Sequence, residues 1–240
     1  MRRNIFNTSI LGVAVVTLSC GGASDKKQAT VVSVEDYETS TFTVAAGDGE
    51  VSGLLGNVTQ DEIERTFSDH QNAMMRCYED AIADLEEIEG EVRFEAEVAS
   101  DGTVNSAFIS ASDLGSIETE SCMVNHLRSF NFKRVPGGVA VIYYPLVLEA
   151  PYDHPAFADW PQSEIDKVVS EHRDALNRCL GGASGVRLTV YIGMGGVVLS
   201  AGASAETLDA YETVSCISNE ARSWTFPNPG DRIVKVFVDL

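Results

Sequence analysis

The sequence predicts an α+β protein that contains two tandem copies of one small domain. Two observations lead to this prediction. A segment of fifteen residues near the middle of the chain recurs without a gap near its end. Within each copy, apolar residues first recur every three or four positions, as in a helix, and then at alternate positions, as in a strand. We expect each copy to run helix, hairpin, helix, strand, with two helices packed on a small antiparallel sheet.

The repeat is clearest around the second cysteine of each copy. The segment ETESCMVNHLRSFNF (118–132) matches ETVSCISNEARSWTF (212–226) at eight of fifteen positions. Two further pairs of segments align in the same order, 70–77 with 172–179 and 92–104 with 186–198. The first copy carries eight more residues after its early cysteine. A duplicated domain therefore accounts for most of the chain.

These alignments divide the 240 residues into five parts. Residues 1–20 form an export signal, 21–53 a flexible tether, 54–149 the first domain, 150–162 a linker and 163–240 the second domain. The tether is predicted from its content of Ser, Thr, Gly, Ala and Asp. The linker holds three prolines, which favour a short extended connection. We therefore expect the two domains to keep a limited range of relative positions.

The first helix of each copy is predicted from a one-sided apolar stripe. Thr59 with Glu62 fits a capping box, and Ser163 with Asp166 fits one less strictly, so both helices have a predicted start. The stripes follow spacings of three and four residues. They consist of Ile63, Phe67, His70, Met74, Cys77 and Ala81 in the first copy, and of Ile165, Val169, His172, Leu176 and Cys179 in the second.

A hairpin, a second helix and a last strand follow in each copy. In the first copy, residues 92–98 and 104–109 alternate as strands on either side of a turn at Asp101-Gly102. The second copy turns at Gly195-Gly196. The second helices carry Cys122, Met123, Leu127 and Phe130, matched by Cys216, Ile217, Ala221 and Trp224. The last strands are expected at 139–149 and 232–240.

The amino terminus resembles the signal of a bacterial lipoprotein. Arg2 and Arg3 precede an uncharged apolar run from about Ile5 to Leu18, which is too short for a comfortable membrane span. Small residues then lead to Cys20, and the resemblance implies that this cysteine is lipid-modified and becomes the first mature residue. An ordinary secretory signal and an uncleaved anchor are the alternatives. With glycine at position 21, the signal resembles those of lipoproteins sent to the outer membrane.

The chain is strongly acidic. It has 36 Asp and Glu residues against 17 Lys and Arg residues, and a formal net charge of −19 at pH 7. Negative charge opposes binding to nucleic acids and to anionic lipids. We therefore expect no nucleic-acid partner, and contact with the membrane only through the lipid anchor.

Four short motifs carry a resemblance to a known family. In the first copy they are RCYE (76–79), DGTV (101–104), RSFNF (128–132) and YPLVL (144–148). In this order they resemble the AgmX/PglI-type C-terminal domain, which belongs to the TonB C-terminal-like group and is frequent in envelope proteins of gliding myxobacteria. The second copy lacks several of these residues. The resemblance implies two tandem TonB-C-like domains that act as envelope interaction modules. TonB-type domains bind partners by adding a strand to an exposed sheet edge.

Two cysteines in each copy are predicted to form a disulfide. In an exported protein, even numbers of cysteines at matched positions indicate disulfides. We therefore expect Cys77 to pair with Cys122 and Cys179 with Cys216, each pair joining two helices. The alternative is that these thiols are in contact but reduced. A zinc site from both cysteines and the nearby histidine of a copy would lack an evident fourth ligand.

The histidines of the repeat are not placed for nucleophilic catalysis. His70 and His172 each lie seven residues before a cysteine, which is about two helical turns. A Cys-His pair needs side chains within hydrogen-bond reach. We expect these histidines to cap the core or to bond to a backbone carbonyl.

The sequence favours a binding function over catalysis. We expect a non-catalytic, lipid-anchored cell-envelope protein, facing the periplasm from the outer membrane, that joins other envelope proteins in an adaptor or structural role related to gliding motility or envelope transport. No cofactor and no metal are expected. Arg76, Tyr78, Glu79 and Arg178 form the candidate interaction surface. The alternatives are an exported thiol/disulfide-active protein and a metal or small-ligand carrier that uses the repeat cysteines.

Overall fold

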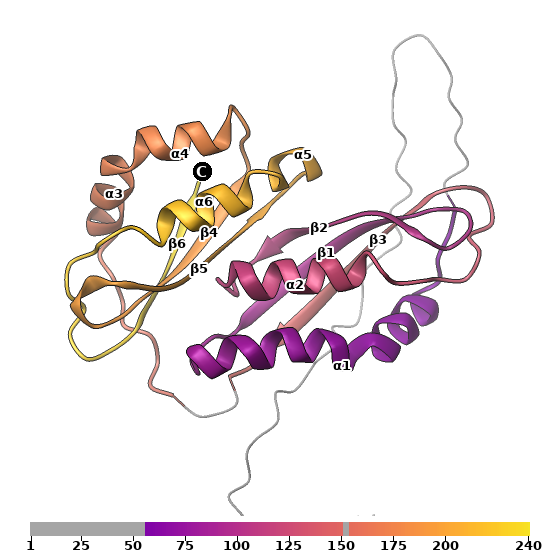
Figure 1. The fold of residues 1–240 in the computed structure, drawn as a ribbon, viewed down its shortest axis with the longest axis horizontal. Helices are drawn as coiled ribbons and strands as arrows, with labels where there is room; N and C mark the ends of the chain where they lie inside the picture. Colours follow the sequence, from indigo (N-terminus) through magenta and orange to yellow (C-terminus); the bar gives the residue numbers. More distant parts are fainter. Residues whose placement is uncertain (1–55, 151–153) are drawn as a thin grey trace, which may run out of the picture.

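The computed structural model describes residues 56–150 and 154–240. Over these residues the chain is an α+β protein with two separate three-stranded antiparallel sheets, one in each copy of the repeat (Figure 1). The predicted signal, Cys20 and the tether (21–53) lie outside the described residues. No helix within the two described ranges is both long and apolar enough to cross a membrane.

The first unit, residues 56–150, follows the predicted order of helix, hairpin, helix and strand. Its sheet has the strand order β2-β1-β3, and both pairings are antiparallel. Its elements are α1 (Gln60–Asp84), β1 (Gly90–Val98), β2 (Val104–Ser112), α2 (Ile117–Leu127) and β3 (Ala140–Leu148).

The second unit, residues 154–240, repeats this order with a divided first helix. Its sheet has the equivalent strand order, β5-β4-β6. Its elements are α3 (Gln162–Glu171), α4 (Arg173–Leu180), β4 (Val186–Ile192), a turn of 3₁₀ helix (Met194–Gly196), β5 (Val198–Ala205), α5 (Leu208–Tyr211), α6 (Val214–Ala221) and β6 (Val234–Asp239).

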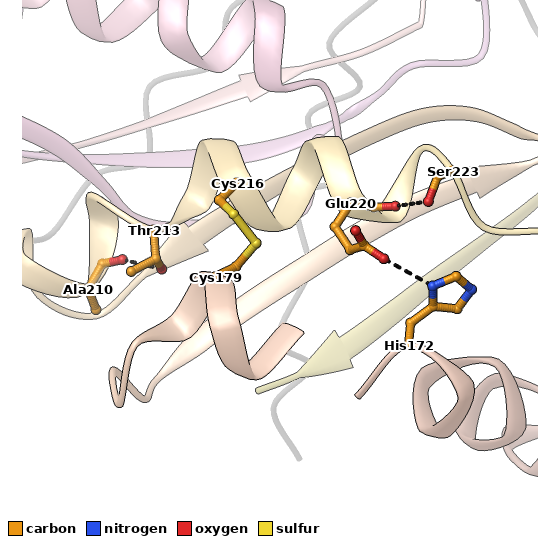
Figure 2. Close-up of a disulfide and its surroundings, with 7 residues drawn as sticks. All are labelled: His172, Cys179, Ala210, Thr213, Cys216, Glu220 and Ser223. Atoms are coloured by element: carbon orange, nitrogen blue, oxygen red, sulfur yellow. Dashed lines mark hydrogen bonds and ion pairs between the residues drawn. A yellow bond between two sulfur atoms is a disulfide. The ribbon is translucent and has the colours of Figure 1, made fainter. Parts of the chain in front are cut away.

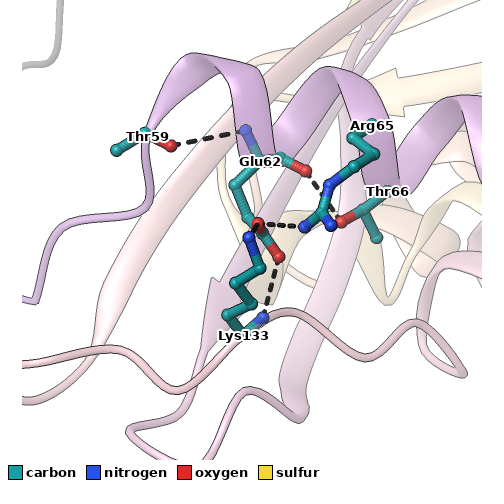
Figure 3. Close-up of polar contacts among 5 residues, drawn as sticks. All are labelled: Thr59, Glu62, Arg65, Thr66 and Lys133. Atoms are coloured by element: carbon teal, nitrogen blue, oxygen red, sulfur yellow. Dashed lines mark hydrogen bonds and ion pairs between the residues drawn. The ribbon is translucent and has the colours of Figure 1, made fainter.

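The start of α1 is fixed by its predicted capping residue and by a buried carboxylate. Thr59 Oγ1 accepts a hydrogen bond from the Glu62 backbone N–H at 3.4 Å. Glu62 Oε1 accepts from the Lys133 backbone N–H at 2.9 Å, and Oε2 pairs with Lys133 Nζ at 3.0 Å (Figure 3). Arg65 pairs with the same carboxylate. Burial alone would raise the pKa of Glu62, but the contacts with Lys133 and Arg65 outweigh it and lower the pKa. The start of α1 is thus tied to the loop that leads into β3.

The second unit departs from the predicted single first helix. α3 ends at Glu171 and α4 begins at Arg173, with His172 between them in a non-helical conformation. The predicted cap at Ser163 is wrong, because Pro161 stands at the N-cap. Proline has no side-chain oxygen, so this helix starts without a capping hydrogen bond.

The first helices of the two units also end differently. Gly181 adopts a φ of 60° and ends α4 two residues after Cys179. Glycine takes up this left-handed conformation at little cost. The equivalent residue of the first unit, Glu79, lies within α1, which continues to Asp84. The additional residues of the first copy therefore lengthen its helix and form the bend that follows it.

The helices of the first unit cover one face of its sheet. Alternate residues of the strands point toward α1 and α2 and form one apolar core with them. This core includes Val92, Phe94, Ala96 and Val98 of β1, Ile142, Tyr144, Leu146 and Leu148 of β3, and Phe67, Met74, Met123 and Leu127 of the helices. The period of two in the sequence thus identifies the inner face correctly.

The central strand of the second sheet, by contrast, is buried on both faces over most of its length. Leu188 and Val190 of β4 face the core of their own unit. Thr189 and Tyr191, on the opposite face of the strand, are fully buried as well, and Tyr191 belongs to the core of the first unit. In the predicted domain this face of the sheet is open; in the structure the first unit covers it.

Small residues of β5 make the closest contact between the units. Ser204 Oγ accepts a hydrogen bond from the Ser112 backbone N–H at 3.0 Å. Ser200 Oγ donates to the Gly115 carbonyl at 2.7 Å. These bonds satisfy polar groups that the contact buries. The face of β5 opposite the core residues Ala201, Ala203 and Ala205 is therefore held against the end of β2 and the start of α2, and we call this contact the junction.

The bend after α1 also binds the second unit. Tyr191 Oη accepts from the Glu89 backbone N–H at 3.2 Å and donates to the Glu89 carbonyl at 3.0 Å. Lys235 Nζ donates to the same carbonyl at 2.7 Å. In the predicted linker, Phe157 packs against the first core, with its ring centroid 5.6 Å from that of Tyr191. The two units are thus packed on each other.

A buried carboxylic acid lies within the junction. Glu120 of α2 is only 1% exposed. Its Oε1 accepts a hydrogen bond from Ser112 Oγ at 2.7 Å, whereas no residue of the described chain bonds to Oε2. A Cβ atom placed on Gly202 would lie 2.3 Å from this Oε2, so only glycine permits the approach of β5. Burial raises the pKa of Glu120 to about 8, which keeps its side chain neutral at pH 7.

We expect the stability of the protein to fall as the pH rises through the range in which Glu120 should ionise. The carboxyl binds its proton more tightly in the folded protein than in the unfolded chain, where its pKa is near 4.5. Between these two pKa values the folded state holds more protons, so the free energy of unfolding decreases by up to about 1.4 kcal/mol per pH unit. This contribution is fully present below pH 4.5 and is lost above about 8.

Urea denaturation at several pH values tests this expectation. Glu120→Gln should remove most of the slope and should be more stable than the wild-type protein above pH 8. Glu118→Gln is the matched control, because Glu118 is an exposed carboxylate two residues away. It should keep the wild-type slope. An unchanged slope in Glu120→Gln would show that this carboxyl is already ionised at neutral pH.

Candidate functional site

The structure contains a disulfide in each unit. Cys77 bonds to Cys122 and joins α1 to α2, with 5.8 Å between their Cα atoms. Cys179 bonds to Cys216 and joins α4 to α6, with 5.5 Å between their Cα atoms (Figure 2). These are the pairs that the sequence predicts. Each one fastens the first helix of a unit to its second helix, over the inner face of the sheet.

The two histidines of the repeat have different environments. His70 Nδ1 donates to the Thr66 carbonyl at 2.9 Å, and its ring stacks on Phe130 with 4.0 Å between centroids. His172 lies at the break between α3 and α4, where Nδ1 is 3.0 Å from Glu220 Oε1 (Figure 2). The expected contact with a backbone carbonyl is thus found for His70, whereas His172 binds a carboxylate on α6.

The histidine nearest to a disulfide is a third one, His126. Its ring nitrogen and the sulfur atoms of Cys77 and Cys122 lie within 4.8 Å of one another. Zinc binds cysteine as the thiolate. In the disulfide form these sulfur atoms do not offer that ligand, and a metal site at this position would require the reduced protein.

The predicted interaction surface is only partly at the surface. Arg76, Glu79 and Arg178 are exposed. Tyr78 is wrong as a surface residue, because it is 0% exposed and its hydroxyl donates to the Ile88 carbonyl. It packs inside the first core and holds the bend after α1. The four residues therefore do not form one binding face.

The described part of the first unit instead has a groove at the outer edge of its sheet, between α1 and β3. Its volume is about 490 Å³. Phe67 and Tyr144 stack within it, with 3.7 Å between their ring centroids. The groove is lined by Phe67, Met74, Met75, Tyr144 and Leu146 together with the polar residues Asp61, Glu64, Arg65, Ser68 and Gln71. We call it the first edge groove.

The second unit has an equivalent groove of about 660 Å³ between α3, α4 and β6, which we call the second edge groove. The strand registers relate the two, because Phe94 pairs with Tyr144 as Leu188 pairs with Val238. In the repeat, Asp166, Val169, Arg173, Leu176, Asn177, Val238 and Leu240 stand where the first edge groove has Glu64, Phe67, Gln71, Met74, Met75, Tyr144 and Leu146. The duplication has kept this groove although most of the side chains differ.

Both edge grooves lie beside strands with one strand neighbour. Within the described residues, β3 pairs only with β1, and β6 pairs only with β4. The other outer strands, β2 and β5, meet at the junction. Pro145 lies inside β3, and proline occurs in sheets mainly on edge strands because it has no N–H to donate. The edges of β3 and β6 are thus the ones left for a further strand.

An edge strand beside a partly apolar groove is suited to an extended polypeptide. The backbone of the edge strand supplies hydrogen-bonding groups, and the groove accepts alternate side chains of the added strand. Both volumes lie within the range of about 300 to 1,000 Å³ that is usual for ligand sites. The arrangement therefore fits binding of a peptide segment.

Comparisons with protein-family models, with curated proteins and with solved structures yield no match to this chain. The interpretation of the site therefore depends on its own geometry.

The sequence patterns do not identify the grooves, because the candidate surface that they predict lies beside the cysteines, at Arg76, Tyr78, Glu79 and Arg178. The sequence predicts that Phe67, Met74 and Leu176 belong to the apolar stripes of the helices. All three are buried, and they also line the grooves. The signal that identifies the groove is the matched position of helix and strand residues in both copies. The match can be recognised only in the folded structure, where β3 lies beside α1 and β6 lies beside α3 and α4.

We expect each disulfide to contribute substantially to stability. Closing loops of 45 and 37 residues corresponds to about 4 kcal/mol each on the chain-entropy model. The double variants Cys77→Ala/Cys122→Ala and Cys179→Ala/Cys216→Ala should each lower the free energy of unfolding by about that amount, measured by urea denaturation.

Reduction of the wild-type protein is the matched control. It should reproduce the combined loss of the two double variants, and each double variant should respond to reductant only through its remaining disulfide. Thiol titration of the unreduced protein should find none of these four cysteines free. Denaturation curves that coincide with and without reductant would contradict the prediction.

Proposed function

We propose that this protein is a binding module of the bacterial cell envelope that captures extended segments of partner proteins in its two edge grooves. The observation that carries the proposal is the presence of the same groove, beside the same outer strand, in both copies of the repeat. A duplicated core alone requires only that the inner faces stay apolar. A groove kept at equivalent positions of the two units favours a function for that edge.

The sequence supports the location and the mode of attachment. A lipoprotein-like signal ending in Cys20, an acidic chain and two disulfides agree with an exported protein that is held at a membrane by lipid. The proposed finer identity is a tandem pair of TonB-C-like domains of the AgmX/PglI type. Strand addition at a sheet edge is the binding mode which that resemblance implies.

The partner is proposed to be another envelope protein that presents an unpaired strand-forming segment. In the first edge groove, Met74 and Met75 offer flexible apolar side chains that adapt to differing residues. In the second, Val238 takes the place of Tyr144. The two grooves should therefore bind extended segments of similar backbone conformation but with different side chains.

Site-specific photocrosslinking in the native envelope tests the proposal. A photoreactive amino acid at Gln71 or at Arg173, the equivalent exposed rim residues of the two grooves, should give crosslinks to a partner protein. The matched controls are Asp69 and Glu171, which are exposed, lie two residues before Gln71 and Arg173 and line neither groove. Asp69 is on α1 with Gln71, whereas Glu171 is the last residue of α3 and Arg173 the first of α4. They should give none.

The crosslinked segment should then be tested as a synthetic peptide. Binding by strand addition would slow amide hydrogen exchange in β3 or β6 and leave the exchange of the central strands unchanged. Crosslinks that are equally strong at the control positions, or a peptide that protects no amide of an edge strand, would rule the proposal out.

A further inference from the structure

A second groove lies at the junction of the two units, apart from the edge grooves. Its volume is about 670 Å³, within the usual range for ligand sites. One wall is the end of α1 and the bend after it, and the other wall is the start of β5. The disulfide Cys77–Cys122 lies against it, with Leu85 and Ile88 beside the disulfide. We call it the junction groove.

Both walls are built from features in which the two copies differ. Asp80, Ala81 and Asp84 belong to the helical turn that the first copy has and the second lacks, because Gly181 ends α4 early. The opposite wall includes Leu199, whose side chain is 44% exposed. Asn105 occupies the equivalent position of the first unit.

Two further apolar residues are exposed on the hairpin of the second unit, close to Leu199 in the chain. Val197 is 51% exposed and Met194 is 73% exposed, and both lie at the β4–β5 turn beside Leu199. The turns of the two units have the same backbone: Thr103 bridges to Asn131 as Val197 bridges to Thr225. Yet the first unit has only exposed polar residues at the three positions, Ser100, Thr103 and Asn105.

Three apolar side chains exposed on one copy of a hairpin, and polar ones on the other, are not explained by folding, since both hairpins form. Exposed apolar surface is costly in water and marks contact with a partner when it is contiguous with a groove. The hairpin of the first unit thus serves as a comparison: it shows that the turn forms with polar residues at these three positions, so the apolar residues of the second unit are not needed for folding.

The charges of the junction groove select the partner. Asp80 and Asp84 are one helical turn apart on α1, so their carboxylates lie on the same side of the helix. Both are exposed, and no residue of the described ranges pairs with either carboxylate. Glu118 also lines the groove but is already paired with Arg222. An acidic wall opposite an apolar wall is complementary to a segment that carries both apolar and cationic side chains.

We infer that the junction groove and the apolar hairpin together bind a basic, amphipathic polypeptide segment, with its apolar side chains on Leu199 and Val197 and its Lys or Arg side chains toward Asp80 and Asp84. The groove volume of about 670 Å³, together with exposed Val197 two residues before Leu199 in the chain, favours a polypeptide several residues long over a small cation. The negative charge of the whole protein adds long-range attraction for such a segment.

Fluorescence anisotropy with the purified full chain tests this inference. The probe is a fluorescein-labelled eight-residue peptide of alternating leucine and lysine, and the comparison peptide has glutamate in place of lysine. The lysine peptide should bind and the glutamate peptide should not. Raising the salt concentration from about 50 to about 500 mM should weaken binding, because it screens the exposed carboxylates.

Two groups of substitutions locate the binding. Met194→Ser, Val197→Thr and Leu199→Asn together give the second hairpin the residues of the first, which form the same turn, so the protein should fold as before. Asp80→Asn with Asp84→Asn removes the charged wall. Each group should weaken binding of the lysine peptide about tenfold or more. Asp61→Asn with Glu64→Asn is the charge-matched control, since these acids lie on α1 but line the first edge groove. This control should change binding less than twofold.

Three results would overturn the inference. The first is wild-type affinity in the hairpin variant or in the Asp80/Asp84 variant. The second is an equal loss in the Asp61/Glu64 control, which would place the peptide in the edge groove of the proposed function. The third comes from sedimentation with neutral phosphatidylcholine vesicles. If the wild-type protein binds them and the hairpin variant does not, the apolar hairpin contacts a lipid surface instead of a peptide.

Discussion

The close approach of β5 to α2 at Gly202 is the contact on which the arrangement of the two units depends. A Cβ atom at this position would lie 2.5 Å from the Ser116 nitrogen as well as against the Glu120 carboxyl, so any side chain would push the second sheet away. The hydrogen bonds of Ser200 and Ser204 to the first unit exist only at this separation. Because Tyr191 is buried in the core of the first unit on the same sheet, the apolar and polar parts of the contact form together. The second sheet thus packs its outer face, the one opposite its own helices, against the first unit.

Residues shared by the two copies and residues that differ have separate roles. The shared residues build the same scaffold in both units. They are the disulfide cysteines and two equivalent contacts, in which Phe132 bonds to Gly102 and Phe226 to Gly196 of the hairpin turns. The edge grooves belong to this shared part. The junction depends on two residues that differ between the copies: Glu120 stands where the second unit has Val214, and Gly202 stands where the first unit has Phe108. Ser200 and Ser204 match serines of the first copy, Ser106 and Ser110, but only the serines of β5 bond across the junction to Gly115 and Ser112. Divergence after duplication therefore produced an asymmetric contact between two units that fold alike.

The sequence predicts the elements of each unit better than it predicts the contact between the units. Helix stripes, strand alternation and matched cysteines are local or repeated signals, and they place α1, the hairpins and the last strands close to where the structure has them. The break at His172 escapes these signals, because the stripe continues through it and the partner of His172 is a carboxylate on α6, 48 residues away. Tyr78 was misplaced for a similar reason: its partner, the Ile88 carbonyl, lies beyond a bend that no periodicity describes. The edge grooves and the junction groove require tertiary registers, which single-sequence patterns do not contain.

The junction also determines which sheet edges are left for binding. A small antiparallel sheet has two outer strands, and an unpaired outer strand tends to pair with another chain unless it is covered. Here β2 and β5 contact each other and α2, so both of these outer strands lie against the other unit. The remaining edges, β3 and β6, are the ones beside the edge grooves. Packing the two units through β2 and β5 therefore leaves the edge grooves beside β3 and β6 outside the junction. If both edge grooves bind extended segments as proposed, a partner with two matching segments would bind the second intramolecularly, at a high effective concentration, because one chain carries both grooves.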